Sequence, residues 1–383
     1  MDFNSIFGYG MARQIKFWNR LATEEILVEF GAEDDITLSP TKTKGAVSTK
    51  YPPLYDDVPG MLEDFESTID PGSFLKTPEM TDDGVPIPIA WPELQFGNGM
   101  AGAMFGGELN TVSTRDHTYT FNEPVINEWS DMNGLFFDRG NTWVRRILDA
   151  LKYFIESGRK PFVVRPFFIY EGADFIVSMR GTTRAFYDFT DDPPGLRDLY
   201  ELGRNTGIEF FEMKVEIIKD HNERLIGNKE YSDMAPIHGI PMLDMDAYAL
   251  CSPEVFEKYG FENKQKIIKH FGGASFYIHA LGRHIIPIAR ELEDLTELWL
   301  FDDPRCPRYF DDRVKWRKMT YDIPLQFYCT VKEFTDALEE KTLPGGTKYN
   351  LMMDGIDLSK EEKEDIINKS RAYRTDKLAG KPK

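Results

Sequence analysis

The chain has 383 residues, of which 41% are hydrophobic and 29% are charged, a composition typical of a soluble globular protein with a large core. Its formal net charge of −18 would repel phosphate backbones and anionic lipid surfaces, so nucleic acid and membranes are poor partners. The three scattered cysteines, the missing signal-peptide pattern and the lack of any run of about 18 apolar residues together predict a reduced, cytoplasmic protein without a membrane span.

The first 140 residues are predicted to form an N-terminal elaboration that packs on the main domain. Residues 1–30 are expected to be helical, with Ile26 and Leu27 on the apolar face. Residues 31–85 are rich in Pro, Gly, Asp and Thr. So long an irregular segment in a compact protein is either a functional lid or a structural cover, including a dimer arm.

A glycine-rich segment follows, with the spacing Gly97-x-Gly99-x-x-Gly102. This formally matches the dinucleotide-binding fingerprint, which requires a buried strand immediately before the first glycine. Three prolines between residues 86 and 92 would break up such a strand. We therefore reject the fingerprint and expect a closely packed helix of small residues at 100–105.

The pattern becomes regular after this point. A hairpin arm is expected within residues 110–131, and a strong amphipathic helix over 142–157. From Phe162 onward strands and helices alternate, which is typical of a parallel sheet or barrel. We predict a (β/α)8 barrel catalytic domain over 141–375 and a disordered tail over 376–383.

The chain is organised around residues 242–284. Asp244 and Asp246 stand two apart in an apolar run, so in a strand both would point to the same face. A helix then begins at Ser252, and the next predicted strand ends at His279. Acids at one strand end and an imidazole at the next are the usual geometry of an α/β-barrel active site.

This stretch resembles the uroporphyrinogen decarboxylase superfamily, which includes the decarboxylase itself and the anaerobic cobamide-dependent methyltransferases. The shared features are the acid-bearing strand, a helix start written Leu250-Cys251-Ser252-Pro253-Glu254-Val255-Phe256, and a strand end written His279-Ala280-Leu281-Gly282. The string MRGTTRAFYDFTDDPPGLRDL, from Met179, also resembles the family's Arg-Gly-…-Asp-…-Asp-Pro segment. The resemblance implies an enzyme that acts on a small molecule at the barrel mouth.

The candidate catalytic residues are Asp246, His279 and Asp244. The two aspartates could hold a general acid beside an ionised partner, or one could cap a helix while the other forms a surface salt bridge. His279 could face the barrel mouth or be a satisfied core residue. The resemblance places Asp246 near a substrate-contacting position. Further candidates for the pocket are Trp91, Tyr170, Arg180, His238 and His284.

A thiolate zinc site is not expected. The zinc-dependent methyltransferases of the superfamily use His-x-Cys with a distant Cys, whereas Leu281 occupies the second position here. Where the distant Cys would fall, the chain has Met352, Met353 and Asp354. Asp246 with His279 could hold a weaker metal, but two ligands are not a motif, and we predict no metal site.

The decarboxylase proper is imperfectly matched, because its arginine-rich substrate loop has no counterpart near Arg13 and Arg20. The one basic concentration, at residues 305–318, could dock an anion or be a solvated face. Our first prediction is a methyltransferase that moves a methyl group from a small methylated donor to the cobalt of cobalamin (corrinoid) carried by a separate corrinoid protein. The alternatives are a cofactor-free decarboxylase of a tetrapyrrole or other carboxylate, and a non-catalytic barrel subunit. A homodimer is left open.

Overall fold

The computed structural model describes most of the chain, namely residues 9–30, 48–49, 57–68, 82–84, 89–92, 99–113, 118–166, 171–226, 239–243, 245–303, 305–353 and 356–380. Within these ranges no helix has the length and apolar character needed to cross a membrane.

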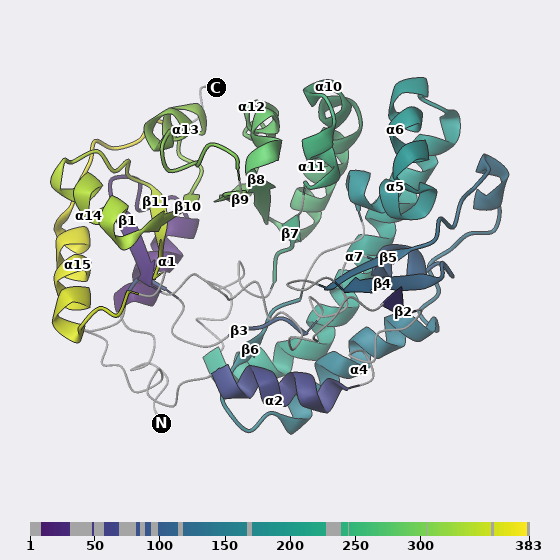
Figure 1. Ribbon diagram of the computed structural model, residues 1–383, viewed down its shortest axis with the longest axis horizontal. Helices are drawn as coiled ribbons and strands as arrows, with labels where there is room; N and C mark the ends of the chain where they lie inside the picture. The colour runs from purple at the N-terminus through teal and green to yellow at the C-terminus, as the bar shows by residue number, and fades with distance from the viewer. Residues whose placement is uncertain are drawn as a thin grey trace.

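The fold is an α/β architecture built on a parallel sheet (Figure 1). In the described residues a six-stranded sheet has the order β1-β11-β10-β9-β8-β7, a second sheet pairs β3 with β6, and a third has the order β2-β4-β5. The ladders of the first two sheets are parallel and those of the third are antiparallel. The strands are β1 (Ile26–Phe30), β2 (Ser48–Thr49), β3 (Ile89–Ala90), β4 (Leu109–Ser113), β5 (Thr118–Asn122), β6 (Val163–Val164), β7 (Met242–Leu243), β8 (Ala274–His279), β9 (Leu295–Phe301), β10 (Leu325–Thr330) and β11 (Thr347–Met352).

Helices follow the strands in the second half of the chain, which confirms the predicted alternation. Figure 1 shows α10, α11 and α12 beside β7 to β9, and α14 and α15 beside β10, β11 and β1. The helices are α1 (Tyr9–Trp18), α2 (Val58–Thr68), α3 (Met100–Ala103), η5 (Trp129–Met132), α4 (Thr142–Ser157), α5 (Gly172–Arg180), α6 (Thr182–Asp191), α7 (Pro194–Ile226), η6 (Ala247–Leu250), α10 (Pro253–Val255), the π-helical turn η7 (Phe256–Gly260), α11 (Phe261–Phe271), η8 (Ala280–Ile285), α12 (Ile286–Ala289), α13 (Arg313–Met319), α14 (Val331–Glu339) and α15 (Lys360–Ala372).

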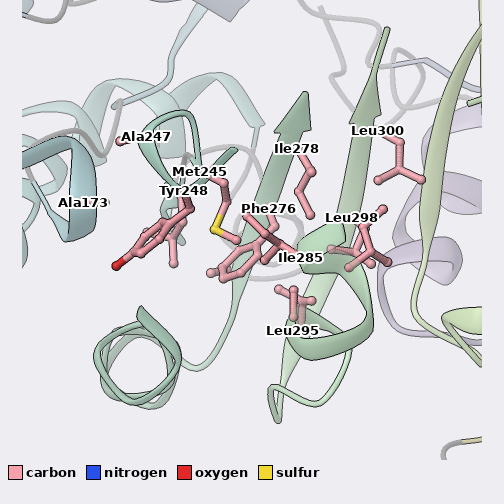
Figure 2. Close-up of a cluster of buried hydrophobic side chains, with 14 of the residues drawn as sticks. Ala173, Met245, Ala247, Tyr248, Phe276, Ile278, Ile285, Leu295, Leu298 and Leu300 are labelled. Carbon is pink, nitrogen blue, oxygen red and sulfur yellow. The ribbon is translucent and has the colours of Figure 1, made fainter. Parts of the chain in front are cut away.

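The two faces of β8 and β9 differ in character because successive side chains of a strand point to opposite sides. One face carries Phe276, Ile278, Leu298 and Leu300, all fully buried. Figure 2 shows these side chains in one buried cluster with Ile285 and Leu295. The other face, which we call the polar face, carries Ser275, Tyr277 and His279 of β8 and Glu297, Trp299 and Phe301 of β9.

The expectation that residues 1–30 are wholly helical is wrong. Helix α1 ends at Trp18, where Arg20 adopts a left-handed conformation with φ of 56°. The β-branched and apolar residues that follow form β1, whose Ile26 pairs with Thr347 of β11. Arg13 holds α1 against this strand, because its Nη2 donates to the Ile26 carbonyl at 2.5 Å while its Nε donates to Asp83 at 2.9 Å.

The hairpin and the small-residue helix are confirmed. β4 and β5 pair antiparallel, and α3 lies within the predicted residues. A Cβ on Gly102 would lie 1.8 Å from Asn122 Nδ2, so close packing against the hairpin explains this glycine. Gly97 lies outside the described residues. The division of the chain at residue 140 stays a prediction.

Candidate active site

His279 stands at the end of β8 with its ring fixed by a neighbouring carboxylate. Its Nδ1 lies 2.6 Å from Asp303 Oδ1, and Asp303 Oδ2 accepts the backbone N–H of Leu281 at 3.1 Å. An ionised carboxylate only accepts hydrogen bonds, so Nδ1 carries a hydrogen and donates it to Asp303. The ring is therefore oriented with Nε2 directed toward the remaining partner, Asp246.

Asp246 lies beside His279, with Oδ1 3.5 Å from Nε2. The aspartate is not on a strand, which corrects the prediction: β7 ends at Leu243, and Asp246 directly precedes the 3-10 helix η6. This helix is held in place because Asp174 of α5 accepts the backbone N–H of Ala247 at 2.9 Å. The side chain of Asp246 is 43% exposed, so solvent or a ligand can reach its carboxylate. Asp244 lies outside the described residues.

The other predicted histidines differ in position. His284 joins two segments at this edge of the sheet, because Nε2 lies 2.9 Å from the Cys251 carbonyl and Nδ1 lies 3.1 Å from the Leu281 carbonyl. It therefore fixes η8, which follows His279, against the segment that carries Asp246. His238, like Tyr170, lies outside the described residues.

The structure places Arg180 in contacts between α5, α6 and the segment after the hairpin. Its guanidinium forms a buried ion pair with Asp188 at 2.7 Å, donates to the carbonyls of Ile126 and Asn127, and lies 4.4 Å from the ring centroid of Trp129. These partners belong to α6 and to the segment that follows the hairpin, so Arg180 joins those segments.

Aromatic side chains cover the polar face below His279. Tyr277 contacts the His279 ring edge-on at 4.8 Å between centroids, and Phe301 lies 5.5 Å from the same ring. Trp299 lies 6.0 Å from Tyr277 and is stacked with Tyr328 of β10 at 6.4 Å. We call Tyr277, Trp299, Phe301 and Tyr328 the aromatic cluster. These aromatic rings form an apolar surface that contacts the His279 ring.

A buried polar layer lies beneath the aromatic cluster. Glu297 is 2% exposed and accepts hydrogen bonds from Ser275 at 2.8 Å, Gln326 at 2.5 Å and the Trp18 indole at 3.2 Å. Burying a carboxylate is unfavourable unless it is hydrogen-bonded, and these three donors meet that requirement. Lys348 of β11 forms an ion pair with Glu29 of β1 in the same sheet.

The loop after β9 supports the site from the side. The Tyr309 hydroxyl donates to the His279 carbonyl at 3.0 Å, and burial raises the pKa of Tyr309, which keeps the phenol neutral. Asp302 accepts the Tyr309 backbone N–H at 2.7 Å and pairs with Arg308 at 3.1 Å.

The basic concentration at residues 305–318 is not a single solvated face. Arg308 is paired with Asp302 and Glu333. Arg317 is buried and donates to the carbonyls of Gly346 at 2.9 Å and Ile323 at 2.7 Å. These arginines fix loops at the ends of strands.

In the described part of the chain, no group of three or more His, Cys, Asp or Glu residues is arranged to hold a metal ion. The three cysteines are free thiols. Burial raises the pKa of Cys251 to about 11, so this thiol, whose residue contacts His284 through its backbone carbonyl, is protonated at neutral pH.

The sequence prediction missed Asp303, although a signal was present. Asp302 and Asp303 directly follow β9 just as His279 ends β8. Carboxyl ends of neighbouring parallel strands meet at one edge of a sheet, so these residues could have been grouped with His279. Glu297 and Trp299 were missed as well; they alternate with buried leucines along β9.

The geometry suits proton transfer. A histidine oriented by one carboxylate, with its second nitrogen directed to another partly exposed carboxylate, can give or take a proton at Nε2. The 3.5 Å separation between His279 Nε2 and Asp246 Oδ1 is longer than a typical hydrogen bond. A substrate atom beside them can therefore form hydrogen bonds with both groups.

Comparison with known proteins assigns the chain to no family. No protein-family model matches it, and no curated protein matches it. Among solved structures, a methyltransferase from Methanosarcina mazei is similar to 72% of this chain over 78% of its own length, with 10% sequence identity and a TM-score of 0.47.

Proposed function

We propose that the protein is a methyltransferase that moves a methyl group from a small methylated donor to the cobalt of a corrinoid on a separate protein. The observation that carries the proposal is the Asp303–His279–Asp246 arrangement, with contacts of 2.6 Å and 3.5 Å at the two ring nitrogens. The resemblance of residues 242–284 to the uroporphyrinogen decarboxylase superfamily supports the same chemistry.

The role of these residues follows from the chemistry of the donor. When the bond between the methyl carbon and its heteroatom breaks, the electron pair stays on the heteroatom. Protonating that atom makes it a better leaving group, and His279 Nε2 together with Asp246 can supply the proton. Asp303 holds the His279 ring and stabilises its protonated form, while the aromatic cluster provides an apolar surface for the donor.

We further infer that β1, β3, β6, β7, β8, β9, β10 and β11 are the eight strands of one (β/α)8 barrel, which would begin at β1 rather than at residue 141. Every ladder among them is parallel, and β1, the first, pairs with β11, the last. In such a barrel the site at the carboxyl end of β8 would lie at the mouth, where a corrinoid domain could approach.

A decarboxylase of a tetra-anionic porphyrinogen is less well supported. It needs several cations that converge on the substrate, whereas Lys348 is paired with Glu29, and Arg308 with Asp302 and Glu333. Such pairing leaves these cations little capacity for four additional carboxylates.

The test is an optical titration of the purified protein with chemically reduced cob(I)alamin and a panel of methylated alcohols, amines, sulfides and ethers. We expect conversion of the Co(I) spectrum to the methylated form with at least one donor. His279→Ala and Asp246→Ala should each abolish the conversion. His270→Ala is the matched control, because this histidine is 42% exposed on α11 and pairs with Glu212. Conversion that survives His279→Ala, or CO2 release from a carboxylate without methyl transfer, would contradict the proposal.

A further inference from the structure

Two side chains of the described residues, Arg165 and Trp299, have buried hydrogen-bond donor atoms without acceptors. In the described structure, Nε and Nη2 of Arg165 and Nε1 of Trp299 are buried and have no hydrogen-bond partner. The large majority of buried side-chain polar atoms have a hydrogen-bond partner, so these unsatisfied donors need an explanation, and a bound acceptor would supply one. Arg165 directly follows β6, and Trp299 belongs to the aromatic cluster.

The backbone around Arg165 is fixed by hydrogen bonds, and its guanidinium lies over an aromatic ring. Its backbone N–H donates to the Ala90 carbonyl at 2.9 Å, and the Asn222 side chain bonds both the N–H and the carbonyl of Val164 at 2.9 and 2.8 Å. The Trp91 ring lies 4.6 Å from the guanidinium carbon. The residue is only 6% exposed. A stacked arginine on a clamped strand is preorganised, so little freedom remains to be lost when it binds a ligand.

Arg165 remains a cation in this setting. Burial lowers the pKa of Arg165 to about 10, while the nearby Glu297 carboxylate opposes that effect, so the side chain is charged at neutral pH. Glu297 does not satisfy the guanidinium, since its oxygens accept from Ser275, Gln326 and Trp18. Glu297 is therefore near Arg165, and Trp299 lies two residues beyond Glu297 on the same face of β9.

The two unsatisfied Arg165 atoms, Nε and Nη2, indicate which kind of ligand would fit. Nε–H and Nη2–H lie on the same side of the guanidinium and form the fork that binds the two oxygens of a carboxylate in parallel. A ligand with a carboxylate and an apolar body would satisfy the fork and the Trp299 indole, and it would place its body on the aromatic cluster.

We propose that Arg165 binds a carboxylate group of the substrate, with Trp299 Nε1 as an additional donor, so that the substrate class is a small carboxylate with an apolar body. This inference rests on the proposed function in one respect only: the reacting group of the substrate is placed at His279. The protein's net charge of −18 repels anions in general. The buried Arg165 cation would attract a carboxylate locally in spite of that repulsion.

The test measures binding without corrinoid or methyl donor, so its failure is separable from failure of the proposed function. Isothermal titration calorimetry would compare benzoate with its neutral isostere benzamide, and acetate with acetamide. For the wild-type protein we expect benzoate to bind about tenfold or more tightly than benzamide, the range expected for charge-assisted bonds. Arg165→Met should abolish this preference, and Arg165→Lys should retain part of it, since an ammonium lacks the fork.

Two further variants keep the test decisive. Arg197→Met removes the same charge from a side chain that is 62% exposed and should bind as wild type does. Trp299→Phe keeps an aromatic side chain but removes the indole N–H donor, and it should weaken benzoate binding several-fold. This variant and Arg165→Lys carry the test if Arg165→Met does not fold. The proposal is overturned if wild type does not prefer either carboxylate, if Arg165→Met keeps the preference, or if Arg165→Lys and Trp299→Phe both bind as wild type does.

Discussion

Replacing Lys264 by methionine should lower the free energy of unfolding by about 3–5 kcal/mol. Lys264 of α11 forms an ion pair with Glu171, and their side chains are 1% and 4% exposed. The substitution removes one partner of a buried ion pair, and breaking such a pair typically costs this much. With about 2.1 cal/mol/K per residue over 383 residues, the unfolding entropy is about 0.8 kcal/mol/K, so Tm should fall by about 5 °C.

Equilibrium urea unfolding and thermal denaturation would measure this effect. The double variant Lys264→Met/Glu171→Leu should recover most of the lost stability, because it removes both charges. Lys266→Met is the control: its exposed pair with Glu262 lies on the same helix, and stability should change by less than about 0.5 kcal/mol. A loss below about 1 kcal/mol for Lys264→Met would refute the reasoning. The pair matters for the site because Glu171 precedes α5, whose Asp174 holds the segment that carries Asp246.

Three further changes test other parts of the structure. Asp303→Asn should lower the turnover rate of methyl transfer about 10²–10⁴-fold and leave KM nearly unchanged, because it disturbs the orientation of His279 without removing the pocket. Steady-state kinetics would measure both values. An unchanged turnover rate would argue against the role of Asp303. Phe276→Ala, in the core of Figure 2, should cost about 3–5 kcal/mol in urea unfolding, and a smaller loss would mean that the cavity collapses. Burial lowers the pKa of His221, although its ring contacts the Phe162 carbonyl at 2.8 Å, so its neutral form is favoured in the folded state. Stability should therefore be fully present above the unfolded pKa of about 6.5 and fall as pH decreases below it, and His221→Gln should flatten this dependence in unfolding experiments between pH 8 and pH 5.

Much of the secondary structure could be predicted because its signals are local. The helix at 142–157 has the predicted bounds, because apolar periodicity and caps depend on nearby residues; here Asn141 accepts the Trp143 N–H at 2.8 Å. Strand β1 was missed because the apolar residues Ile26 and Leu27 continue a helical spacing, whereas their pairing with β11 is a distant contact.

The site could be predicted only in part for the same reason. His279 and Asp246 were found from a pattern within one β–α–β stretch, and the structure places them side by side. Asp303 comes from the next strand end, so its contact with His279 joins residues 24 positions apart. The unsatisfied fork of Arg165 has no sequence signal, because it depends on which acceptors every neighbouring segment brings close.

The pairing of β1 with β11 has a consequence for synthesis on the ribosome. Ile26 pairs with Thr347, which is 347 − 26 = 321 positions later. At about 5–20 residues per second, β1 emerges roughly 15–60 seconds before the strand that covers this edge. During that interval a fully apolar Ile-Leu-Val edge is open to wrong partners, so the nascent chain should depend on holding chaperones until its last strand has been translated.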